Sequence, residues 1–150
     1  MLHDLPPRRP GIVTAPLFDY ETLAILAPGH PLAGKRWLRP EEVAAETLIS
    51  YPVEDDMLDV VRHFLAPAGL RPKRRHAELT VAILQLVASG RGIAALPAWS
   101  VAPYLARGYV VGKPLGPKGL RCELHAAMPE SLAARPYLRD FLTEVRKQSA

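Results

Sequence analysis

The sequence predicts an α/β fold in which helices flank a mostly parallel sheet. Two observations carry this prediction. Between Thr22 and Gly112, short apolar runs that stop at proline or glycine alternate with amphipathic segments of helical period. A strand and a helix then follow without the partners that a complete domain would give them. Because the strand–helix–strand order implies right-handed crossovers, the strands of the alternating region are expected to run parallel.

Apolar runs closed by a breaking residue predict the buried strands. They are residues 22–27 (TLAILA), 47–51 (TLISY), 93–96 (IAAL) and 109–111 (YVV), with a further strand expected near residues 75–79. Continuous apolar character is typical of strands that are covered on both faces. Residues 120–128 (LRCELHAAM) instead alternate apolar and polar side chains, as a half-buried strand does. Residues 1–19 are rich in Pro and Arg and lack a sustained period, which predicts a loop.

Apolar side chains spaced by three and four residues predict the helices. The expected helices are residues 38–43, 56–66, 80–90, 99–107 and 136–147. The helix at 56–66 is expected to begin with an aspartate cap. In the helix from Thr80, the side chains expected to pack inward are Val81, Ile83, Leu84, Val87 and Ala88. The stripe on the last helix consists of Tyr137, Leu138, Phe141, Leu142 and Val145.

The glycine pair in LQLVASGRGIAALP, residues 84–97, raises the question of a phosphate-binding loop. Such a loop needs a strand, then glycines, then a helix whose N-terminal amides face the anion. Here the order is reversed, because a helix leads into Gly90 and a strand follows Gly92. The prediction is that Gly90 adopts the left-handed conformation that ends a helix and that Gly92 permits a close turn.

Composition and charge place limits on the class of protein. With 150 residues, 49% hydrophobic and 23% charged, the chain is expected to be globular. It has no apolar run long enough for a membrane span and no signal peptide at its start, so a cytoplasmic location is expected. The single Cys122 fits a reducing compartment and is expected to be a semi-buried strand residue. The net charge of +4 comes mostly from scattered arginines, and the basic run at 71–76 is interpreted as a solvated approach to a strand.

Catalytic and metal-binding motifs are absent from the sequence. It holds no HExxH, CxxC or nucleophile-elbow pattern, and Ser50 and Ser89 have no neighbouring base. Asp59 and His63 lie four apart on a predicted helix, but two ligands are too few for a metal site, so a surface pair is favoured. We therefore expect no enzyme, no catalytic residue, no metal and no cofactor.

The most informative candidate for a binding site follows the second predicted strand, in the segment YPVEDDM at 51–57. Ligands in open parallel sheets bind beyond the carboxyl ends of the strands. Three consecutive acidic residues there would repel an anion and attract an ammonium group. The alternative is that Asp55 and Asp56 only cap the following helix.

These segments also carry a resemblance to a known family. The matching pieces are PLFDYE at 16–21, APGHPLA at 27–33, YPVE with LDV and HFLAPAG at 51–69, and GIAALP at 92–97. The chain resembles the effector-binding domain of LysR-type transcriptional regulators. Within that family it is most similar to the activators of methionine biosynthesis, the MetR type.

The resemblance implies two Rossmann-like subdomains like those of periplasmic solute-binding proteins, with an effector cleft between them. Residues 22–112 would form the second subdomain, whereas residues 1–21 and 113–150 would be the remnant of the first. The family's winged helix-turn-helix, linker helix and opening βαβ part are not found in the sequence. DNA would therefore be bound only through that missing N-terminal segment.

The resemblance also implies an effector, partners and site residues. Homocysteine would be the small-molecule co-effector, and the protein would form homodimers or tetramers without membrane contact. The effector-binding residues would be Tyr51, Pro52, Val53, Glu54, Met57, Leu79, Thr80 and Pro97, with Glu54 meeting the effector ammonium. The alternatives are a solute-binding protein for transport, a Rossmann-type enzyme, and a dimerisation fragment without DNA binding.

Overall fold

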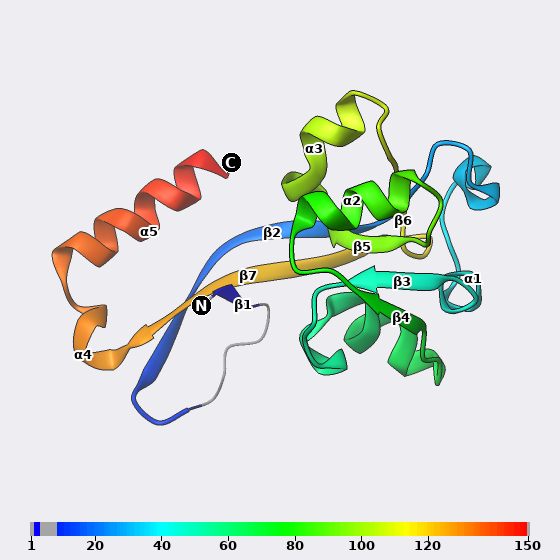
Figure 1. Cartoon of the computed structure of the whole chain (residues 1–150). Coiled ribbons are helices and arrows are strands. Elements are labelled where there is room, and N and C mark those ends of the chain that lie inside the picture. Colours follow the sequence, from blue (N-terminus) through cyan, green and yellow to red (C-terminus); the bar gives the residue numbers. More distant parts are fainter. Residues whose placement is uncertain (1, 4–8, 150) are drawn as a thin grey trace. The chain divides into compact units, whose positions relative to one another are not determined.

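The structure is a computed structural model that describes residues 2–3 and 9–149, and it divides into two units (Figure 1). The larger unit is Glu21–Leu120, and the smaller one combines Met1–Tyr20 with Arg121–Ala150. The predicted boundary between residues 112 and 113 thus differs from the observed one between residues 120 and 121. Leu115 explains the difference, since it is buried and bridges to Leu38 of the larger unit.

The sheet of the larger unit is mixed. Strand β3 (Thr47–Ser50) runs parallel to β4 (Lys73–His76), and a parallel bridge links Leu48 to Ile93 beside β5 (Ala94–Pro97). Strand β2 (Ile12–Leu26) is antiparallel both to β5 and to β6 (Val111–Pro114). The α/β class is confirmed and three strands are parallel as predicted, but the first predicted strand runs against its neighbours. Apolar content shows that this strand is buried, but it does not encode the strand's direction.

The longest strand was not predicted in full. Residues 12–19, expected to be a loop, are part of β2, which continues unbroken to Leu26. Pro16 inside this segment argues for an irregular connection, since proline cannot donate a ladder hydrogen bond. Long-range pairing overrides that local signal, because β2 is hydrogen bonded to β7 (Leu120–Pro129). The predicted strand at 109–111 is likewise displaced, to Val111–Pro114.

Two helices close the core of the larger unit. Helix α2 (Thr80–Ala88) begins as predicted and buries Ile83, Leu84 and Val87. Helix α3 (Ala98–Ala106) contributes Val101. The buried cluster consists of these four residues together with Ile25, Ile49, Ala94, Leu96 and Val110. The prediction that Val81 packs inward is wrong, because 55% of this residue is exposed.

The glycine pair forms the end of α2 and the turn into β5, as predicted. The N–H of Gly90 donates to the Val87 carbonyl (2.9 Å) and that of Arg91 to the Leu86 carbonyl (3.0 Å), which is the Schellman arrangement. Gly90 has φ +74°, the left-handed value that this motif requires. At Gly92 a β carbon would lie 2.4 Å from the Thr47 carbonyl oxygen, so glycine permits the close approach to β3.

The predicted helix at 56–66 is shorter and irregular. Asp55–Met57 form a 3-10 turn (η2), and a π-helical segment covers Val60–Leu65 (η3), followed by a 3-10 turn at Ala66–Ala68. The prediction of an aspartate cap is wrong, because no side chain caps either segment. Asp55 instead pairs with Arg74, so the residues before Val60 stay outside the helix.

A short helix in the larger unit carries a carboxylate with a perturbed pKa. Helix α1 (Pro40–Ala44) begins with the Arg39 N–H donating to Glu42 Oε2 at 2.8 Å. Lys35 also pairs with Glu42, whose side chain is only 12% exposed. The backbone hydrogen bond first, and then Lys35, lower the pKa of Glu42 from 4.5 to about 2.

This carboxylate makes part of the stability depend on pH. We expect Glu42→Gln to lower the free energy of unfolding at pH 7 by about 1 kcal/mol, the usual contribution of a helix-capping interaction. Because the folded-state pKa is depressed, that contribution is present above pH 4.5 and disappears as the pH falls toward 2. Urea unfolding between pH 7 and pH 2.5 measures the difference, with the neighbouring Glu41→Gln as control. A difference from wild type that stayed constant with pH would contradict this account.

The smaller unit contains the strand and helix expected at the end of the chain. Strand β1 (Leu2–His3) is antiparallel to β7, which contains Cys122 as predicted, although the cysteine is buried and not semi-buried. Helix α5 (Pro136–Gln148) follows the short helix α4 (Glu130–Ala133). The small core combines Leu17, Ala126 and Met128 with Leu138, Leu142 and Val145 of α5. The other two residues of the predicted stripe, Tyr137 and Phe141, are more than half exposed.

Within residues 2–3 and 9–149, none of the helices combines the length and apolar character that crossing a bilayer requires.

Candidate functional site

A small cavity lies at the carboxyl ends of β3 and β5. Strand β2 runs antiparallel to β5 and places Thr22 opposite Pro97, so the middle of β2 meets the end of β5. The cavity has a volume of about 150 Å³. Its lining residues are Thr22, Tyr51, Met57, Leu58, Asp59, Val60, Ala95, Leu96 and Pro97. This is the edge of the sheet at which a ligand site was predicted.

Three of the predicted site residues line this cavity, namely Tyr51, Met57 and Pro97. Thr80 contacts it indirectly, because its hydroxyl is hydrogen bonded to the Tyr51 hydroxyl with 2.5 Å between the oxygens. That contact fixes the Tyr51 ring against the start of α2. The predicted residues are therefore brought together in part.

The remaining predicted site residues are Pro52, Val53, Glu54 and Leu79, and none of them is among the residues lining this cavity. The Glu54 side chain is exposed. Val53 is 38% exposed and Leu79 is 68% exposed. They lie on the rim of the turn or at the start of α2, where a ligand would reach them only from outside the cavity.

Arg74 holds the turn after β3 in place, a role that was not predicted. Its Nε and Nη2 donate to Ser50 Oγ at 3.1 and 2.9 Å, and Nη2 also donates to the carbonyls of Tyr51 (2.9 Å) and Val53 (3.0 Å). Its Nη1 pairs with Asp55 at 2.6 Å. One guanidinium thus binds both ends of the segment that supplies Tyr51. The sequence showed only a basic run, within which Arg74 does not stand out.

Asp59 supplies a carboxylate to the cavity wall. Its side chain is 17% exposed and lies 3.5 Å from Arg62 Nη2. Arg62 Nε also donates to His63 Nε2 at 3.1 Å, so the arginine contacts both residues that were considered as a metal pair. Among the described residues, no group of three or more His, Cys, Asp or Glu is placed to hold a metal ion.

Thr22 supplies a hydroxyl to the same cavity. The residue is 2% exposed. Its Oγ1 has no hydrogen-bond partner within the described part of the chain. A buried hydroxyl without a partner is unusual in a folded protein, because most buried polar groups are paired. Thr22 was predicted only as the start of an apolar strand, so this feature was missed.

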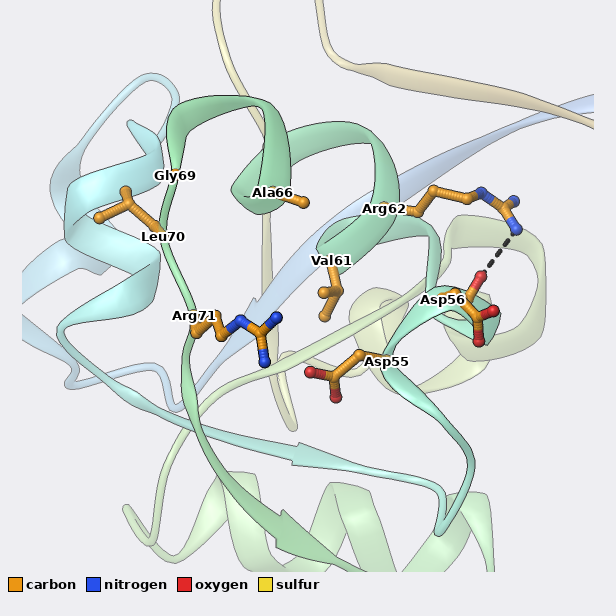
Figure 2. A pocket seen from close by; sticks show the side chains of 8 residues that line it. All are labelled: Asp55, Asp56, Val61, Arg62, Ala66, Gly69, Leu70 and Arg71. Atoms are coloured by element: carbon orange, nitrogen blue, oxygen red, sulfur yellow. Dashed lines mark hydrogen bonds between the residues drawn. The ribbon is translucent and has the colours of Figure 1, made fainter.

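A second pocket lies on the same segment that supplies Met57 and Asp59 to the cavity (Figure 2). It has a volume of about 440 Å³ and is lined by Asp55, Asp56, Val61, Arg62, Ala66, Gly69, Leu70 and Arg71. Figure 2 shows the Arg71 and Asp55 side chains extending toward each other below Val61. Arg62 Nη1 donates to the Asp56 carbonyl at 2.8 Å and joins η2 to η3. None of the predicted effector contacts lies here.

An open α/β sheet with a partly apolar cavity at its strand ends is the arrangement of a small-molecule-binding domain. The chain belongs to the LysR substrate binding domain family, which it matches over residues 1–150.

Relatives with a described role are regulators of transcription. The chain is 44% identical over 138 residues to the HTH-type transcriptional regulator MetR of Haemophilus influenzae, covering 92% of this chain and 45% of that protein. It is 43% identical to MetR of Escherichia coli K12, covering 99% of this chain and 46% of that protein. The chain therefore spans less than half the length of these two regulators.

Solved structures agree with this assignment. The regulatory domain of MetR from N. meningitidis, a LysR family regulator, has a TM-score of 0.89 and 46% sequence identity. The match covers 98% of this chain and 68% of that domain. The effector-binding domain of QuiR in complex with shikimate shares the fold, with a TM-score of 0.78 and 20% identity. The periplasmic-binding-protein-like α/β fold expected from the sequence is confirmed.

Proposed function

We propose that the chain is the effector-sensing part of a MetR-like activator of methionine biosynthesis, and that homocysteine binds in the Tyr51 cavity. The observation that supports this most directly is the composition of the cavity wall. Met57, Leu58 and Val60 offer apolar contact for a short side chain, whereas Asp59 offers a carboxylate for an ammonium group. The similarity to MetR proteins supports the regulatory role.

The remaining parts of the proposal concern the whole regulator. Residues 21–120 would be the second subdomain of the family and the smaller unit part of the first. DNA would be bound by a helix-turn-helix outside these 150 residues. The regulator would act in the cytoplasm as a homodimer or tetramer. Exposed apolar side chains on and beside α2 and α3 support self-association, among them Leu79, Val81 and Trp99.

Calorimetric titration of the intact regulator tests the ligand. We expect homocysteine to bind with measurable heat, methionine to bind more weakly, and a dicarboxylate such as succinate to give no heat, because the described residues that line the cavity include the Asp59 carboxylate and no Lys or Arg. A flat trace for homocysteine on folded protein would refute the effector assignment. Equal binding of succinate would refute the role given to the carboxylates.

Two carboxylates are candidates for the effector's ammonium group. Glu54 is proposed from the sequence, and Asp59 lines the cavity. Because a hydrogen bond to a charged group contributes about 1.5–3 kcal/mol, we expect Asp59→Asn to weaken homocysteine binding about 10- to 100-fold. Glu54→Gln, at an exposed position, is expected to change the affinity less than about 3-fold. If Glu54→Gln weakens homocysteine binding more than Asp59→Asn does, Glu54 and not Asp59 contacts the ammonium group.

A further inference from the structure

The Thr22 hydroxyl is unusual because it is buried but has no hydrogen-bond partner among the described residues. Residue Thr22 is 2% exposed, and its Oγ1 lacks a partner among the described residues. A buried hydroxyl that has lost water without gaining a partner destabilises the folded state. Valine has the same shape and suits a β-strand equally well, so packing alone does not explain threonine.

The other polar side chains that line the cavity, those of Tyr51 and Asp59, have partners elsewhere. The Tyr51 hydroxyl is hydrogen bonded to Thr80, and the Asp59 carboxylate pairs with Arg62. Pro97, opposite Thr22 on β5, has no N–H to donate. A partner for Thr22 Oγ1 must therefore enter the cavity from outside.

The wall around Thr22 indicates the chemistry of that partner. A threonine hydroxyl accepts a hydrogen bond from an ammonium group and donates one to a carboxylate. Asp59 contacts Arg62 through one oxygen at 3.5 Å and keeps lone pairs for a second partner, and no Lys or Arg is among the described residues that line the cavity, so the wall favours a cation over an anion. Resting on the function proposed above, we propose that the Thr22 hydroxyl is a specificity residue that accepts a hydrogen bond from the amino group of the effector.

This assignment predicts opposite effects of Thr22→Val on stability and on binding. In the free protein, removal of the unpaired hydroxyl is expected to raise the melting temperature by about 2–4 °C. In the complex, loss of a hydrogen bond to a charged group is expected to weaken homocysteine binding about 10-fold or more. A residue with only a structural role would not raise the melting temperature while lowering the affinity.

The experiment compares four proteins and two ligands by thermal unfolding and calorimetry of the intact regulator. Thr22→Ser keeps the hydroxyl and is expected to retain homocysteine binding, whereas Thr14→Val is a control for the same change elsewhere in β2. The ligands are homocysteine and 4-mercaptobutanoate, which lacks the amino group. 4-Mercaptobutanoate is expected to bind wild type more weakly than homocysteine does, and Thr22→Val is expected to weaken binding of homocysteine while leaving that weaker binding unchanged.

Several outcomes would overturn the assignment. If Thr22→Val binds homocysteine with wild-type affinity, the Thr22 hydroxyl makes no hydrogen bond to the effector. If the substitution weakens the binding of both ligands equally, the amino group is not the partner of the hydroxyl. A lower melting temperature of Thr22→Val than of wild type would show that the hydroxyl is already paired. A wild-type regulator that binds neither compound would instead refute the proposed effector, and with it the amino group as the partner of Thr22.

Discussion

Replacement of Gly92 by alanine is expected to destabilise the larger unit by about 3–5 kcal/mol, near the upper end for a single substitution. A β carbon at this position would lie 2.4 Å from the Thr47 carbonyl oxygen and 3.1 Å from the Ile49 side chain. The same carbonyl accepts the Ile93 N–H at 2.9 Å, one of the bonds that join β3 to β5. Relief of the clash would therefore separate two strands of the core.

Gly90→Ala is the matched control for this prediction. Gly90 also has a positive φ, +74°, but an added β carbon there would meet nothing within 4 Å. We expect a loss of only about 1 kcal/mol, the cost of a left-handed residue that is not glycine. Urea unfolding followed by circular dichroism measures both variants. Similar losses for the two would show that backbone conformation, and not the approach to β3, makes Gly92 necessary.

Replacement of Arg74 by methionine is expected to affect both stability and effector binding. The change removes the hydrogen bonds from the guanidinium to Ser50, Tyr51 and Val53, and leaves the largely buried Ser50 hydroxyl unpaired. We expect a loss of about 2–4 kcal/mol. The ion pair with Asp55 adds little to this figure, because that carboxylate is 42% exposed.

Loss of Arg74 also releases the segment that carries Tyr51 to the cavity. Homocysteine affinity is therefore expected to fall at least about 10-fold, even under conditions in which the protein remains folded. Arg74→Lys is expected to recover only part of the loss, since one ammonium group cannot reproduce the planar set of donors. Arg75→Met, at the exposed neighbouring position, is the control. An Arg74→Met protein with wild-type affinity would show that the turn keeps its shape without the guanidinium.

Local signals were sufficient for much of the fold. Helix α2, helix α5 and strand β7 were predicted within one or two residues, because each has a clear period and a proline or glycine near its ends. The N-terminal half of β2 was missed because Pro16 and the arginine-rich start indicate a loop locally. Its pairing partner β7 comes about a hundred residues later in the chain, where no local pattern refers to it.

The candidate site shows the same division between local and long-range information. Tyr51 and Pro97 follow strands, so their place at the sheet edge was predictable from the sequence. Thr22 was not, since its exposure and missing partner depend on β5 and the turn after β3. Arg74 was not either, because a contact with Ser50 requires the parallel register of β3 and β4.

The charged side chains of strand β4 affect how the protein behaves at high concentration. Within the described residues β4 pairs with β3 alone, so its other side presents unpaired backbone groups. Lys73, Arg75 and His76 are exposed along this strand, while Arg74 is half-buried. Charged side chains on an open strand oppose the addition of a strand from another molecule. The basic run therefore combines two tasks, since one arginine shapes the turn and its neighbours protect the protein from aggregation.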